Sequence, residues 1–164
     1  MDYPKRKSIR LKGYDYSQNG YYFITICVQN MKNILCRGEH CSPENNHQFE
    51  LSDIGILVDT AIRNIPKYYA NVEIEKYVIM PNHLHMILVL QSNESGRTMF
   101  DPTAPTIGRI IKQMKGYIAK QIGYSIWQKS YYDHIIRNES EYQKIWQYID
   151  TNPLKWESDK YYNR

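Results

Sequence analysis

Apolar and polar residues follow two different periods along this chain, and these periods separate predicted strands from predicted helices. Residues 21–28 are mostly aromatic or β-branched and place apolar side chains on both faces. Such a run is typical of a strand in the centre of a sheet. By the same signs we predict strands at residues 72–80 and 84–91, and a short edge strand at residues 131–136.

Two segments instead repeat their apolar residues every three or four positions, as amphipathic helices do. The first helix is predicted over residues 53–65, with Ser52 as its N-cap and Pro66 as the residue that stops it. The second begins after Thr106. Its apolar face consists of Ile107, Ile110, Ile111, Met114 and Ile118. Its exposed sides carry the cations Arg109, Lys112, Lys115 and Lys120.

The last predicted helix has a well-marked start and end. Asn138 is a favourable N-cap residue, and Glu141 three positions later completes a capping-box pattern. Pro153 ends the helix. Tyr148 and Asn152 stand four residues apart near this end, so their side chains share one face beside the apolar stripe.

The order of these elements predicts the fold. Antiparallel neighbouring strands, with helices packed against one face, indicate an α+β fold of the ferredoxin-like type. With 164 residues, the chain fits a single domain over residues 1–164. Residues 31–50 are predicted as a loop region in which residues 34–35 and 49–51 form a small ribbon, and residues 92–105 as a flexible connection.

Composition favours a globular protein, and the charge is compatible with a polyanionic partner but does not by itself decide for one. The net charge is +4 and the sequence contains 16 tyrosines, a residue type that suits stacking on nucleobases as well as half-buried positions. Residues 1–12 form a basic arm. Its cations are Lys5, Arg6, Lys7, Arg10 and Lys12. Such an arm commonly lies on phosphates, and a solvated tail is the alternative interpretation.

The chain shows no sign of export or membrane insertion. It has neither an apolar run of spanning length nor the apolar core of a signal peptide, so we expect a cytoplasmic protein without a membrane partner. Its three cysteines would then stay reduced. A zinc loop is a minor alternative, in which the ligands would be Cys36, His40, Cys41 and His47.

Two histidines lie within the most apolar stretch of the sequence, residues 77–90. Because side chains alternate along a strand, His83 and His85 point to the same face and can hold one metal ion between them. Core histidines bonded to the backbone are the alternative, but two buried imidazoles on one face are costly unless something binds them. Tyr148 has a candidate third ligand, Asn152, one helical turn away, and a tyrosine can act as a nucleophile beside a metal.

Three segments carry a resemblance to a known family. They are residues 81–85 (Pro-Asn-His-Leu-His), residues 126–139 (Ile-Trp-Gln-Lys-Ser-Tyr-Tyr-Asp-His-Ile-Ile-Arg-Asn-Glu) and residues 148–156 (Tyr-Ile-Asp-Thr-Asn-Pro-Leu-Lys-Trp). Together with residues 6–16, they resemble the single-tyrosine HUH transposases, and within these the REP-associated tyrosine transposase group. The resemblance spans nearly the whole chain in the expected order.

This resemblance implies an activity and its residues. Tyr148 would be the nucleophile, and His83 and His85 would bind Mg or Mn, with Asn152 at the position where relatives supply an amide ligand. Many transposases of the wider family have Gln there, and the shorter Asn puts direct ligation in question. The family cuts single-stranded DNA beside hairpins, leaving a 5′-phosphotyrosine and a free 3′-hydroxyl.

The resemblance also suggests how DNA is bound. Arg6, Lys7 and Arg10 in the N-terminal arm would read a short sequence beside the hairpin. Additional candidate DNA contacts are Lys12, Lys112, Lys115 and Arg137. The Asp133-His134 pair would either contact DNA or support the final helix. The wider family often forms dimers that exchange the tyrosine helix, whereas the REP-associated group includes monomers. A catalytically inactive nucleic-acid-binding module on the same fold is the competing hypothesis.

Overall fold

A computed structural model describes residues 10–42, 48–91 and 105–162 of the chain. The strands are β1 (Gly20–Cys27), β2 (Cys36–Ser42), β3 (Gln48–Leu51), β4 (Val72–Ile79), β5 (His83–Leu90) and β6 (Tyr132–Ile136). The helices are α1 (Asp53–Tyr68), α2 (Ile107–Ile122) and α3 (Glu139–Thr151), with two 3-10 helices, η1 (Gln29–Met31) and η3 (Pro153–Ser158). All seven elements predicted from the sequence are present at these positions.

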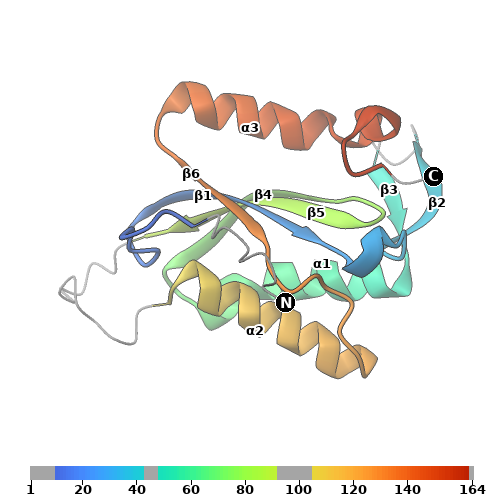
Figure 1. Cartoon of the computed structure of the whole chain (residues 1–164), viewed down its shortest axis with the longest axis horizontal. Helices are drawn as coiled ribbons and strands as arrows, with labels where there is room; N and C mark the ends of the chain where they lie inside the picture. Colours follow the sequence, from blue (N-terminus) through green and yellow to red (C-terminus); the bar gives the residue numbers. More distant parts are fainter. Residues whose placement is uncertain (1–9, 43–47, 92–104, 163–164) are drawn as a thin grey trace, which may run out of the picture.

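A four-stranded antiparallel sheet in the order β4-β5-β1-β6 forms the centre of the molecule. Helices α1 and α2 cover one face of this sheet, and α3 lies across the other face (Figure 1). The predicted ferredoxin-like α+β fold is therefore confirmed. The expectation that all helices pack on one face is wrong, because α3 crosses over and buries the second face of the central strands.

Strand β5 is buried along its whole length, since strands flank it on both edges and helices lie on both faces. Leu84, Met86 and Leu88 belong to the main core, and each has 0% of its surface exposed. His83 and His85 alternate with these residues and therefore face the side of α3. The apolar run seen in the sequence thus places two polar rings in the most protected strand.

Local signals in the sequence account for most element boundaries. The side chains of Ser52, Thr106 and Asn138 all accept a hydrogen bond from a backbone N–H in the first turn of their helices, as predicted. Helix α1 continues to Tyr68 instead of stopping before Pro66, because a proline in the last turn removes a single hydrogen bond.

The small ribbon predicted between residues 31 and 50 is present as the antiparallel pair β2 and β3, although its first strand begins at Cys36. The Cys36 thiol is buried and lies near the Ile79 carbonyl, and burial raises its pKa to about 12. The Cys36 side chain thus belongs to the hydrophobic core. The side chains of His40, Cys41 and His47, the other candidate zinc ligands, lie outside the described residues.

Some predicted features fall outside the described part of the chain, namely Arg6 and Lys7 of the basic arm and most of residues 92–105. Among the described residues, none of the helices combines the length and the apolar character needed to cross a bilayer.

A prediction follows from Gly55, in the first turn of α1. A methyl group at this position would collide with the carbonyl oxygen of Leu35, which accepts the N–H of Ser52. We expect Gly55→Ala to lower the free energy of unfolding by roughly 1–3 kcal/mol, as overpacking does. Gly116 in α2 is the matched control, because nothing lies within 4 Å of the added methyl group. Gly116→Ala should stabilise by up to about 1 kcal/mol in denaturant titrations. Equal effects of the two variants would contradict this packing.

Candidate active site

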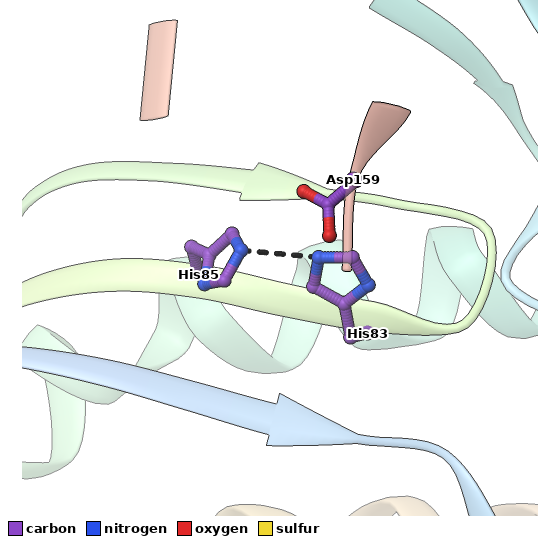
Figure 2. A group of neighbouring side chains, drawn as sticks. All are labelled: His83, His85 and Asp159. Carbon is purple, nitrogen blue, oxygen red and sulfur yellow. Dashed lines mark hydrogen bonds between the residues drawn. The ribbon is translucent and has the colours of Figure 1, made fainter. Parts of the chain in front are cut away.

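His83 and His85 point into one small space above β5, as their spacing predicts (Figure 2). Their Nε2 atoms lie 3.0 Å apart, and neither residue has more than 1% of its surface exposed. Each Nδ1 atom has a hydrogen-bond partner at 2.8 Å, Asn82 Oδ1 for His83 and Thr25 Oγ1 for His85. Partners on Nδ1 orient the imidazoles of metal sites in this way and leave Nε2 for the ion.

Both imidazoles are held in their neutral form. Burial lowers the pKa of His83 from 6.5 to about 4, with the carboxylate of Asp159 opposing this change. Burial also lowers the pKa of His85 well below 6.5, and the neighbouring His83 and Lys160 add to the effect. Neutral imidazole is the form that ligates a metal.

Asp159 is a residue of this site that the sequence analysis missed. It follows η3, and its carboxylate approaches the two rings from the segment that passes over β5 (Figure 2). The ligand atoms of His83, His85 and Asp159 all lie within 4.8 Å of one another. Two imidazole nitrogens and a carboxylate oxygen form a donor set that suits a divalent transition metal such as Mn. The residues present therefore fit a metal ion.

Asn152 is buried at the end of α3 and contacts this cluster through its amide nitrogen. Its Nδ2 donates a hydrogen bond to Asp159 Oδ2 at 2.9 Å, and its Oδ1 is a buried oxygen with no hydrogen-bond partner among the described residues. The amide thus supports Asp159 directly and keeps one acceptor free at the edge of the cluster.

Tyr148 lies beside the histidines in the same chain. Its hydroxyl oxygen is 3.3 Å from His85 Nε2, and its ring packs edge-on against the rings of His85 and Phe23. Burial, together with the nearby Asp159 and Tyr161, raises the pKa of Tyr148 to about 12. The hydroxyl keeps its proton at neutral pH unless a positive charge is added nearby.

A second tyrosine, Tyr161, also borders the site. Its ring centroid lies 4.5 Å from that of His83, and its carbonyl oxygen accepts a hydrogen bond from Asn82 Nδ2 at 2.8 Å. Unlike Tyr148, Tyr161 makes no hydroxyl hydrogen bond to either histidine within the part of the chain that the structure describes. The segment after α3 therefore contributes a carboxylate and a ring to the site. No spacing rule in the sequence marks either residue.

The predicted DNA-binding cations differ in their exposure and in their contacts within the protein. Lys12, Lys112 and Arg137 are exposed. Arg10 is also exposed, but its guanidinium donates to the Tyr131 hydroxyl at 2.7 Å and lies over the Tyr131 ring. Lys115 donates to two backbone carbonyl oxygens, and burial lowers its pKa to about 8. Arg10 and Lys115 thus have contacts within the protein that anchor the chain around Tyr131.

The two members of the Asp133-His134 pair point to opposite faces of β6. His134 Nε2 pairs with the carboxylate of Glu141 in α3, and the other oxygen of that carboxylate accepts the N–H of Arg137. His134 therefore links the edge strand to the helix that carries Tyr148. Asp133 is buried on the other face, near Tyr16.

Comparison with known proteins identifies a family for this chain. Residues 43–152 match the family model described as "Transposase IS200 like". An uncharacterized protein of Haemophilus influenzae is 37% identical over 96% of this chain and 93% of its own length. Another protein of that organism, provisionally named a REP-associated tyrosine transposase, is 23% identical over 86% of this chain and 74% of its own.

Among solved structures, a REP-associated tyrosine transposase bound to a REP hairpin superimposes with a TM-score of 0.58 at 22% identity. The match covers 89% of this chain and 73% of that one, and it supports the same fold. The family match spans strands β4, β5 and β6, the two histidines and the helix that carries Tyr148, so the resemblance predicted from the sequence is confirmed. The chain therefore belongs to the IS200-like transposase family.

Proposed function

We propose that this protein is a metal-dependent DNA strand transferase that cuts single-stranded DNA beside a hairpin and forms a 5′-phosphotyrosine at Tyr148. The main support is the contact between the Tyr148 hydroxyl and His85, whose Nε2 converges with that of His83. A nucleophile and a candidate metal site thus meet within one chain. Similarity to a transposase solved with a REP hairpin supports hairpin DNA as the partner.

In this proposal His83, His85 and Asp159 hold Mg or Mn, and Asn152 orients Asp159 or adds its free Oδ1 as a further ligand. The ion would polarise a phosphoryl oxygen and lower the pKa of the nearby phenol. No external energy source is needed, because a phosphotyrosine bond replaces the phosphodiester bond that is broken.

The chain's own residues position the reaction. The Tyr148 oxygen forms a bond to phosphorus as the bond from phosphorus to the 3′-oxygen breaks. The phenolic proton passes to solvent, and the departing 3′-oxygen takes up a proton and becomes a 3′-hydroxyl. Attack by a 3′-hydroxyl reverses these steps and joins a new strand. The contact between Tyr148 and His85 lies within one chain, which supports Tyr148 acting on the metal site of its own protomer.

The identity of the nucleophile can be tested with a hairpin oligonucleotide and Mn. A label on the 3′ side of the cleavage site should appear in a denaturant-resistant adduct, and a label on the 5′ side should be released. We expect Tyr148→Phe to abolish the adduct. Tyr161→Phe and Tyr142→Phe are controls from the same site and the same helix, and both should still form it. An adduct that persists in Tyr148→Phe would refute the assignment. Tight DNA binding by the wild-type protein without an adduct would favour an inactive binding module.

The metal ligands can be tested by measuring Mn affinity. His83→Ala and Asp159→Ala should each weaken binding at least about tenfold, and His83→Ala should still bind DNA. Asp150→Ala is the matched control, because Asp150 is an exposed carboxylate in α3 that pairs with Lys76. If Asn152→Ala weakens Mn binding and Asp159→Ala does not, the third metal ligand is the Asn152 amide and not the Asp159 carboxylate.

The low pKa of His83 predicts how acid affects the metal-free protein. Unfolding raises the pKa from about 4 to 6.5, so the unfolded state binds more protons between these values. Stability should therefore fall as the pH drops from about 6.5 to about 4. The contribution of His83 is on the order of 3 kcal/mol. Denaturant titrations should show a shallower pH dependence in His83→Gln than in the wild type, and equal slopes would contradict this protonation state.

A further inference from the structure

Asn82, directly before β5, has an amide group whose orientation is determined by its neighbours. Its Nδ2 donates to the carbonyl oxygens of Met31 at 3.3 Å and Tyr161 at 2.8 Å. Carbonyl oxygens only accept hydrogen bonds, so the amide nitrogen must face them. A rotated amide would bring its own oxygen against two acceptors. The Oδ1 of Asn82 therefore faces His83.

This orientation determines the tautomer of His83. Asn82 Oδ1 lies 2.8 Å from His83 Nδ1 and can only accept a hydrogen bond, so Nδ1 carries the proton. A neutral imidazole has a single proton, and the Nε2 of His83 is therefore a lone-pair acceptor. In this form His83 already presents the nitrogen that would bind a metal.

The tautomer of His85 follows from that of His83. The two Nε2 atoms lie 3.0 Å apart, and a hydrogen bond between them needs one proton. Because His83 Nε2 is the acceptor, His85 Nε2 must be the donor. The Nδ1 of His85 then has a lone pair and accepts the hydroxyl proton of Thr25 at 2.8 Å. The metal-free site thus contains a directed chain of hydrogen bonds from Thr25 through both rings to Asn82.

From this chain we infer that metal binding changes the tautomer of His85 and leaves that of His83 unchanged, with Asn82 and Thr25 as the positioning residues. The inference rests on the proposed metal site. Both Nε2 atoms must offer lone pairs to an ion, so the single proton of His85 moves from Nε2 to Nδ1. The Thr25 oxygen can accept as well as donate, and it then receives the hydrogen bond from Nδ1. Asn82 cannot change its role, because its amide is held by two carbonyl groups.

The same chain also affects the nucleophile. In the metal-free protein His85 Nε2 carries a proton, so the Tyr148 hydroxyl at 3.3 Å has no lone pair on that nitrogen to receive its proton. His85 is thus excluded as the general base for Tyr148, both without the ion and when its Nε2 binds one.

Nitrogen NMR of the full-length protein tests this inference. In protein labelled with ¹⁵N in its histidines and freed of metal, long-range proton–nitrogen spectra should show His83 protonated on Nδ1 and His85 protonated on Nε2. Zn is a suitable diamagnetic probe. Titration with Zn should convert His85 to the Nδ1-protonated form without changing His83. Spectra of His83→Gln and His85→Gln assign the signals.

Matched variants test the two positioning residues. We expect Asn82→Ala and Thr25→Val to weaken Zn binding about 10- to 100-fold, as loss of a ligand's partner does. Asn71→Ala and Thr60→Val are the controls. Their side chains donate hydrogen bonds to the backbone carbonyls of Gln91 and Ile56, respectively, away from the site. The Zn affinity of the controls should stay within about twofold of the wild-type affinity, a much smaller change than the one expected for Asn82→Ala and Thr25→Val.

The outcomes separate this inference from the proposed function. Zn binding with an unchanged His85 tautomer, or a metal-free His83 protonated on Nε2, would overturn the tautomer change and leave strand transfer unaffected. Failure to bind Zn or Mn would overturn both the metal site and the tautomer change. An adduct at Tyr148 that forms in the presence of chelator would contradict the metal dependence alone.

Discussion

The arrangement of this molecule depends on burying two neutral imidazoles at the start of the central strand β5. A buried polar ring is unfavourable unless its nitrogens have partners. Here the partners come from separate parts of the chain, with Thr25 in β1, Asn82 in the preceding turn and Tyr148 in α3. Because each partner also belongs to a packed segment, the site keeps its geometry only when the second face of the sheet is packed.

The position of Tyr148 depends on how α3 is attached to the sheet. At its start, Glu141 joins the helix to His134 in β6. Further along, Lys76 of β4 binds Asp150 at 2.6 Å and lies over the ring of Trp146. These polar pairs lie at both edges of the sheet, and they hold the helix across it while its apolar residues pack on the strands. A helix fixed at both edges keeps the phenol beside His85, which suits a reaction that requires fixed geometry.

Some of the basic side chains make contacts within the protein and are therefore less available to a bound nucleic acid. Arg10 and Lys115 meet at Tyr131, where both cations lie over the same ring. Gly108 allows this approach, because a Cβ there would lie 3.3 Å from the Arg10 guanidinium. Counting cations along the sequence therefore overestimates the number available for phosphates. Of the predicted DNA contacts that the structure describes, Lys12, Lys112 and Arg137 are exposed and have no such contact with Tyr131.

The sequence by itself determined the strands and helices and the pairing of His83 with His85, because these depend on periods and caps within short segments. The role of Tyr148 as the nucleophile is implied by the resemblance to a family and stays a prediction. Only the tertiary structure decided which face α3 covers and that Asp159 joins the histidines. Asp159 follows the last predicted helix without any spacing signal, and only the turn of η3 brings it over β5. The sequence does not reveal the role of Asn82 for the same reason, since the carbonyls that orient it belong to segments 51 and 79 residues away. Local patterns follow from neighbouring residues, whereas a buried polar network forms only when distant segments pack together.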